Sequence, residues 1–180
     1  MAHYPQPYVH YLIEFHATRD YFECHEIMEE FWKERGADDP HARIWVGLIR
    51  VAVAQYHHRR GNIQGASKML SLAIGSLEGT ELSLLALDGR RLLQQLTDQY
   101  ARLTAEKGPY PFNDMNLPIT DPGLIEQCKA SSEQIAAVWG MPSTLTDDAL
   151  VHRHRLRDRT EVIEARSQAA ATKRRAREGH

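Results

Sequence analysis

Hydrophobic residues recur at helical spacing along most of the chain, so the pattern predicts an all-α protein. The periodic stretches cover residues 8–17, 21–36, 41–60, 63–77 and 89–103, with short polar or glycine-containing breaks between them. The sequence contains no alternation long enough for a β-strand and no repeat with a fixed period. The predicted fold is a small bundle of antiparallel helices with a C-terminal helical extension.

Helix-start signals support these boundaries. Asp20 lies three residues before Glu23, the spacing of a capping box, which predicts a helix from Tyr21 that ends near Gly36. Residues that commonly cap helix N-termini also precede the later helices: Asp39 before Pro40, Asn62, Asp88, and Asp121 before Pro122.

The predicted helix over residues 41–60 is apolar in nearly every direction around its axis. A helix of that kind is normally buried on all sides. We therefore expect the bundle to pack around residues 41–60, with the neighbouring helices laid antiparallel by short loops.

The amino-acid composition changes in residues 107–122, KGPYPFNDMNLPITDP. This segment is too rich in proline, glycine and asparagine to continue a helix. This segment is expected to wrap over the body, with Leu117 and Ile119 as anchors. A helix over residues 123–139 should follow, and a last helix should begin near Thr146. The predicted organisation is a helical core domain (1–106), a proline-rich connection (107–122) and C-terminal helices with a basic tail (123–180).

Charge is unevenly distributed along the chain. Residues 151–180 hold nine Lys and Arg against four acidic residues, so the net charge of −2 leaves −7 on residues 1–150. An acidic body with a basic tail suggests self-association or an anionic partner for the tail, and a solvated helix end is the plainer alternative. The tail lacks interleaved aromatic residues, so nucleic acid is the less expected partner.

Composition places the chain among ordinary globular proteins, with 42% hydrophobic and 26% charged residues. The two cysteines, Cys24 and Cys128, form neither a disulfide framework nor a zinc-ribbon spacing. No leading segment resembles a signal peptide, and the longest apolar run, IWVGLI, is too short to span a bilayer. A cytoplasmic protein without a membrane partner is expected.

Candidate chemistry centres on His25 and Glu29, which are four residues apart and can touch on one helix. Phe22 and Trp32 flank them on the helical wheel, so both polar side chains are expected to be buried and to need partners. Gln55 and His58 of the central helix, with Asn62 one turn on, could complete one cluster. The candidate site residues are His25, Glu26, Glu29, Trp32, Gln55, His57, His58 and Asn62.

Several interpretations of this cluster stay open. The first is a satisfied polar network that fixes helix register. The second is a divalent transition metal held by His25, Glu29 and His58, as in a metal-dependent hydrolase. HEIME lacks the second histidine of the zincin motif HExxH. The third is metal-free acid–base chemistry, in which His25 carries the proton and Glu29 orients it.

Two binding sites are further alternatives. Trp32 and Trp45 could line a groove for a peptide or ligand. Arg59 and Arg60, in HHRRGN, could bind phosphate with the amides of the next helix, although such a run is also typical of a basic helix end. A binding or interaction module is the preferred function, and the metal-dependent hydrolase is the alternative.

The motifs YFECHEIMEEFWKE, WVGLIRVAVAQYHHRRGNIQGA, NLPI and HRHRLRDRTEVI resemble the domain of unknown function 309 family, most closely its longer versions in Gram-positive bacteria. The resemblance implies a small all-helical domain in a prokaryotic cytoplasm, with no assigned activity. The family's motif positions would be Phe22, Glu23, His25, Glu26, Glu29, Trp32, Gly47, Leu48, Ile49, His57, Gly61, Asn62, Gly65 and Ala66. Arg50 departs from the family's usual glutamine, which argues against a neutral polar network there. Gly65 and Ala66 are expected at a close helix crossing.

Overall fold

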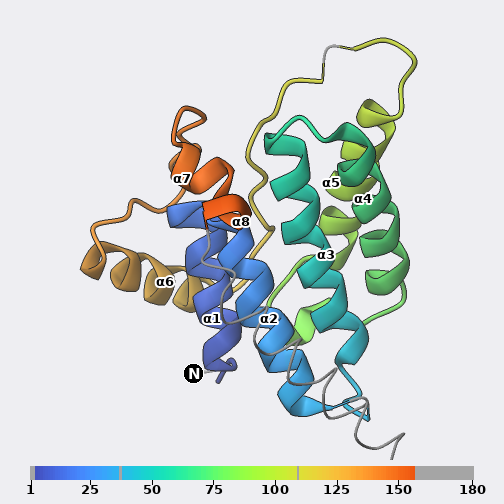
Figure 1. The fold of residues 1–180 in the computed structure, drawn as a ribbon. Helices are drawn as coiled ribbons and strands as arrows, with labels where there is room; N and C mark the ends of the chain where they lie inside the picture. Colours follow the sequence, from blue (N-terminus) through green and yellow to red (C-terminus); the bar gives the residue numbers. More distant parts are fainter. Residues whose placement is uncertain (1–2, 37, 109, 157–180) are drawn as a thin grey trace, which may run out of the picture.

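The predicted all-α fold is confirmed by a computed structural model, which describes residues 3–36, 38–108 and 110–156 (Figure 1). The bundle is built from α1 (Gln6–Ile13), α2 (Tyr21–Arg35), α3 (Ala42–Arg59), α4 (Ile63–Leu77) and α5 (Gly89–Leu103). A π-helical turn, η1 (Glu14–Thr18), continues α1, and a 3₁₀ turn, η2 (Leu82–Leu85), precedes α5. The last helices are α6 (Pro122–Gln134), α7 (Asp148–Val151) and α8 (Arg153–Leu156).

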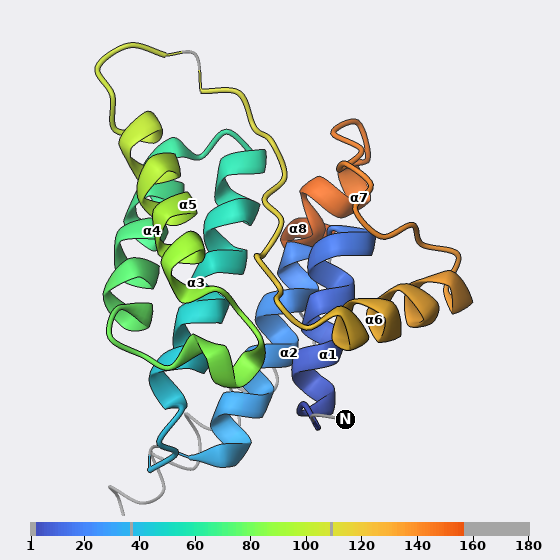
Figure 2. The ribbon, with the colours of Figure 1, turned by 180° about the vertical axis from the view of Figure 1, so that it is seen from behind.

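Successive helices from α1 to α5 run in alternating directions, and α3 lies between α2 and α4 (Figures 1 and 2). The side chains of α3 are buried toward several neighbours at once, including Ile44, Trp45, Leu48, Val51, Ala52, Ala54 and Gln55. The prediction of a buried central helix is therefore confirmed.

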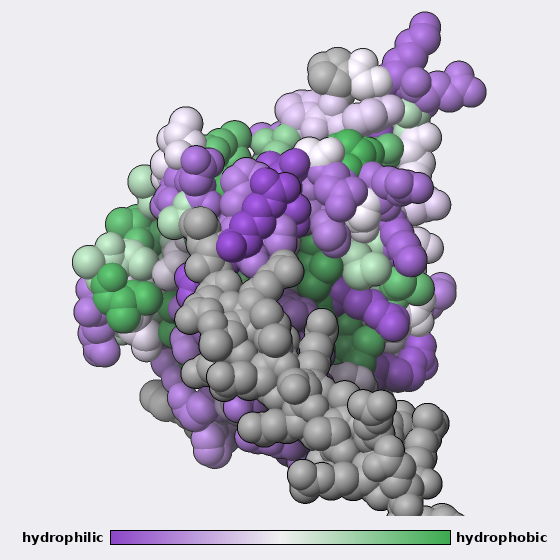
Figure 3. Space-filling model, viewed as in Figure 1, coloured by the Kyte–Doolittle hydropathy of each residue, from purple (hydrophilic) through white to green (hydrophobic). Residues whose placement is uncertain are grey.

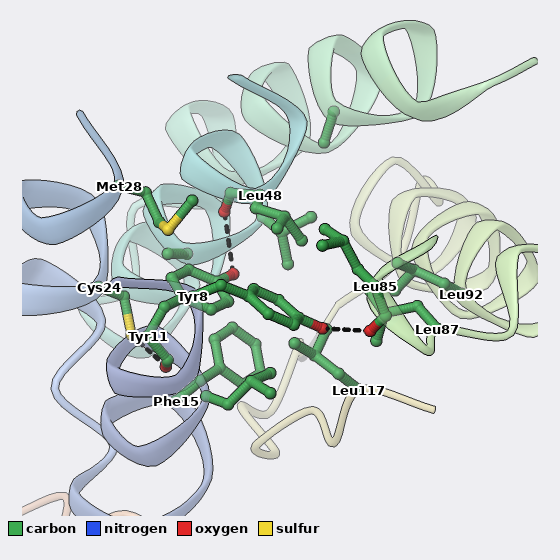
Figure 4. Packing of buried hydrophobic residues seen from close by; sticks show 14 of the residues in the cluster. Tyr8, Tyr11, Phe15, Cys24, Met28, Leu48, Leu85, Leu87, Leu92 and Leu117 are labelled. Carbon is green, nitrogen blue, oxygen red and sulfur yellow. Dashed lines mark hydrogen bonds between the residues drawn. The ribbon is translucent and has the colours of Figure 1, made fainter. Parts of the chain in front are cut away.

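Tyrosines join α1 to the rest of the core (Figure 4). The hydroxyl of Tyr8 donates to the carbonyl of Leu85 at 2.8 Å, and that of Tyr11 donates to the carbonyl of Leu48 at 3.0 Å. Both rings are fully buried. Burying a phenol without a hydrogen-bond partner is unfavourable, so these two bonds let large aromatic surfaces pack without an unsatisfied hydroxyl.

Most of the predicted caps are confirmed. Asp20 accepts from the Glu23 amide, and Asn62, Asp88 and Asp121 cap α4, α5 and α6 in the same way. Asp39 is the exception, because α3 begins two residues later and His41 is its N-cap. The Asp39 carboxylate accepts instead from the His41 amide and from the indole of Trp45, both at 2.9 Å. It shapes the turn and fixes a core tryptophan.

Residues 110–121 return along the bundle beside α3, as Figure 2 shows, with the predicted anchors in place. Leu117 is buried, and Ile119 forms an isolated bridge with Leu87. After this segment α6 packs against α1, where Leu124 and Cys128 join the same hydrophobic core as the bundle. The division of the chain into three domains stays a prediction.

Two predicted helices were too long. The helix expected over 123–139 ends at Gln134, because Ala136 adopts a left-handed conformation with φ of 56° and turns the chain away. The last helix, expected from Thr146 onward, is the short pair α7 and α8 separated at His152. Its predicted continuation past Leu156 lies outside the described residues.

In the described part of the chain, no helix combines the length and the apolar character that crossing a bilayer requires.

Close packing of α3 on α4 depends on one glycine. A Cβ on Gly47 would lie 2.3 Å from the Leu77 side chain, whereas a Cβ on Gly75 would meet nothing within 4 Å. Gly65 was expected at a helix crossing, but its missing Cβ makes room for the capping side chain of Asn62 instead. Ala66 is fully buried.

We expect Gly47→Ala to destabilise the protein by about 1–3 kcal/mol, because the added methyl group overpacks the contact with Leu77. Gly75→Ala is the matched control and should stabilise α4 by roughly 0.5–1 kcal/mol through helix propensity. Urea denaturation of both variants measures the two free energies of unfolding. Equal effects of the two substitutions would contradict the close approach at Gly47.

Candidate functional site

His25 forms the predicted pair with Glu29 on α2, and Glu26 joins it. The Nδ1 atom of His25 lies 3.2 Å from Glu26, and Nε2 lies 3.4 Å from Glu29, which also pairs with Lys33 at 2.9 Å. The hydrogen bond from Lys33 lowers the pKa of Glu29. The expected burial was wrong, since the His25 and Glu29 side chains are 27% and 35% exposed. The flanking aromatic residues, Phe22 and Trp32, are also only partly buried, so this side of α2 lies at the surface.

The central helix holds a separate polar network that faces α5. Gln55 donates to Gln99 at 2.8 Å, Gln99 donates to Nδ1 of His58 at 3.0 Å, and Nε2 of His58 donates to the Tyr110 carbonyl at 3.1 Å. Gln55 and Gln99 are buried, and burial lowers the pKa of His58. The predicted single cluster of His25, Glu29, Gln55 and His58 was therefore wrong, because Gln55 and His58 are bonded toward α5 and residue 110.

The remaining candidate residues have local roles. Asn62 caps α4 with its carbonyl oxygen, and its amide contacts Nδ1 of His57 at 3.0 Å. Trp32 is half-buried against the core. Trp45 is buried and bonded to Asp39, so it does not form the exposed wall that a shared groove with Trp32 would need.

Two buried arginines, Arg19 and Arg59, form a feature that the sequence did not reveal, and we call them the arginine clamp. Arg19 follows the π-helical turn in a left-handed conformation and is 2% exposed. Its guanidinium donates to the carbonyls of Phe15, Met115 and Met141, at 3.0, 3.0 and 2.8 Å, and to Asn116 at 2.8 Å. One side chain thus joins η1 to two distant segments.

Arg59 completes the clamp from the end of α3. It donates to the Arg19 carbonyl at 2.6 Å, to Ser143 at 3.0 Å and to the Leu150 carbonyl at 3.3 Å, and it lies over the Tyr21 ring. Arg59 is thus directed into the molecule rather than toward a phosphate. Little in the sequence could have indicated this, because an arginine near the end of a helix normally points to solvent.

The clamp holds residues 135–145 in place while their apolar side chains face outward. Gly140 donates its amide to the His16 carbonyl at 2.8 Å, and the amide of Ser143 donates to Asp114 at 2.5 Å. Exposed fractions are high for four large apolar residues in this segment: Ile135 56%, Val138 61%, Met141 54% and Leu145 56%. Figure 3 shows apolar surface at this side of the molecule, over the far end of α6.

A cavity of about 760 Å³ lies beside this segment. Its lining includes Arg91, Asp98 and Arg102 of α5 on one side and His16 and Trp139 on the other. Trp139 stacks on the His16 ring with centroids 4.5 Å apart. His16 accepts the Leu117 amide at Nε2 and donates from Nδ1 to the Leu12 carbonyl. Both ring nitrogens are engaged, so His16 has a structural role and not an acid–base role in this cavity.

We expect stability to fall between about pH 7 and about pH 5, because burial lowers the pKa of His16 to about 4 from an ordinary value of 6.5. In that range the unfolded chain binds the proton and the folded chain does not, so the loss is about 2 kcal/mol. Urea denaturation at the two pH values measures it. His16→Gln should remove this part of the pH dependence, whereas the same change at exposed His3 should not.

Among the described residues, His25, Glu26 and Glu29 form the group that could hold a metal, with ligand atoms within 4.8 Å of one another. His58, the predicted third ligand, is not in it. One imidazole and two carboxylates suit a divalent transition metal such as Zn²⁺.

Zn²⁺ held by this group would be lost on His25→Ala, and titration calorimetry of the wild type and the variant measures the difference. His10→Ala is the matched control, since His10 pairs with Glu14 four residues on but is outside the three-ligand group. Equal loss of binding in both variants would contradict a site at His25.

Comparison with known proteins places this chain in a family. The family model for "Domain of unknown function (DUF309)" matches residues 8–69, which contain all the candidate residues and the arginine clamp. A relative in Bacillus subtilis (strain 168), "Uncharacterized protein YpuF", is 42% identical over 179 residues, which cover 97% of this chain and 99% of the relative. No solved structure matches the chain. Because the similarity to this relative spans nearly both whole chains and the family motifs are present, the protein belongs to the DUF309 family.

Proposed function

We propose that this protein is an interaction module that binds a second copy of itself through residues 135–145. The observation that carries the proposal is a segment held by partly buried hydrogen bonds while four large apolar side chains face solvent. Seven large apolar residues are exposed in the described part of the chain, and four of them fall in these eleven positions. Contiguous exposed apolar surface of this kind commonly marks a binding site.

The charge pattern favours a second copy as the partner. Residues 134–146 contain no charged residue, although residues 1–150 carry a net charge of −7. Two copies related by a two-fold axis meet through the same patch. An uncharged apolar patch is complementary to itself, whereas most other parts of this acidic surface would bring like charges together.

A cytoplasmic location is part of the proposal. Cys24 and Cys128 are both free and buried. Free buried cysteines behave as small core residues and are compatible with a reducing compartment.

We expect the protein to form dimers that the double substitution Ile135→Asp and Val138→Asp converts to monomers. The two new carboxylates of each copy, four in the dimer, would repel one another at a self-complementary interface and lose their hydration. Light scattering after size-exclusion chromatography, over about a hundredfold range of protein concentration, measures the mass.

Leu84→Asp is the matched control, because Leu84 is 53% exposed on η2 and lies outside residues 135–145. This variant should dimerise like the wild type. Circular dichroism confirms that each variant is folded. A wild-type protein that stays monomeric throughout, or a double variant that still dimerises, would show that residues 135–145 do not mediate self-association.

A further inference from the structure

A groove of about 680 Å³ runs between α1 and α2 and is bordered by α6. Its apolar lining includes Val9, Ile13, Ile27 and Phe31. Glutamates 23, 30 and 34 of α2 line the same groove. Apolar surface beside several carboxylates suits a segment that carries both small apolar residues and cations.

Few cationic side chains lie near the carboxylates on the acidic side of this groove. Residues 23–34 contain five glutamates and one lysine, Lys33, which pairs with Glu29. Glu30 and Glu34 are exposed, and no cation among the described residues pairs with either. An incoming cationic segment would therefore meet available carboxylates on α2.

The described chain ends at the head of this groove. Arg153 of α8 forms ion pairs with Asp20 and with Glu23, the latter at 3.4 Å. Glu23 also lines the groove, and α8 lies beside the N-terminal end of α2 in Figure 1. The next residues of the chain thus start near Glu23 at the N-terminal end of α2 and near Tyr56 of α3, to which His154 is bonded.

We infer that residues 157–180 of the same chain bind along this groove. They contain seven Arg and Lys against four acidic residues, and four of the cations fall within residues 173–177. Val162, Ile163 and the alanines at 169–171 supply small apolar side chains for the groove lining.

The tail is long enough for its basic cluster to reach the glutamates of the groove. Lys173 lies seventeen positions after Leu156, a stretch that spans roughly 25 Å as a helix and more if extended. The distance along α2 from Glu23 to Glu34 is roughly 17 Å at helical rise. The basic cluster can therefore reach Glu30 and Glu34.

Attachment to the same chain favours this partner over a free one. A tethered segment has an effective concentration in the millimolar range, so weak ion pairs suffice to hold it. The same ion pairs are screened by salt, so the tail should leave the groove as ionic strength rises. This inference does not depend on dimerisation, because it involves none of residues 135–145.

Energy transfer between two dyes on the full-length chain tests the inference. One dye is attached at Gln127→Cys, which borders the groove, and the other at His180→Cys. Cys24 and Cys128 are buried and should label slowly. We expect high transfer at low salt, and a drop of about twofold or more on adding salt or on Glu30→Lys with Glu34→Lys.

Two further variants sharpen the test. Glu78→Lys with Glu81→Lys makes the same charge change at exposed positions away from the groove and should leave transfer unchanged. A variant with glutamate at residues 173, 174, 175 and 177 should by itself show lower energy transfer. Combining it with Glu30→Lys and Glu34→Lys should restore the transfer.

Low energy transfer in the wild type at low salt would overturn the inference. If the same protein then binds a DNA duplex and loses this binding as salt rises, the tail is assigned to nucleic acid. If adding excess unlabelled protein abolishes the energy transfer, the transfer occurs between two copies, and binding within one chain is overturned. Equal effects of the groove variant and the Glu78 and Glu81 variant would also overturn it.

Discussion

Two buried guanidinium groups determine the course of the second half of the chain. A guanidinium keeps its charge at any pH that the protein meets, so burying it is favourable only where most of its N–H groups find acceptors. Arg19 finds acceptors on residues 115, 116 and 141, and Arg59 finds them on Ser143 and Leu150. Residues 113–150 thus supply acceptors to both members of the arginine clamp where they pass over the π-helical turn.

The same constraint explains why apolar side chains face solvent in this part of the molecule. Arg19 needs the main-chain carbonyl of Met141, and Gly140 gives its amide to His16, so the backbone there is turned inward. With the peptide groups directed to the clamp, the Val138 and Met141 side chains are left on the outer side. Partly buried hydrogen bonds thus hold exposed apolar side chains in fixed positions, which is the arrangement expected of a binding surface formed before its partner arrives.

The parts of the fold that could be predicted from sequence are those set by residues close together in the chain. Asp20 caps its helix and His25 meets Glu29 because helical geometry brings such neighbours together. Partner choice over long separations could not be predicted. Gln99 is bonded to Gln55 from 44 residues away, and nothing local marks it. The clamp was missed for the same reason, since three of the four acceptors of Arg19 are backbone carbonyls, which carry no sequence signal.

The net charge of the molecule affects both the apolar segment 135–145 and the acidic groove beside α2. Two acidic bodies repel each other as they approach, even when the contacting patch is neutral. A basic tail held along the glutamates of α2 would reduce the net charge that each copy presents, so it would weaken this repulsion without touching residues 135–145. The free energy of association would then depend on where the tail lies. High salt acts on this balance in two opposite ways, because it releases the tail and also screens the remaining repulsion. With both proposed contacts in place, the tail and the apolar segment would be coupled through the electric field of the whole body and would need no shared contact.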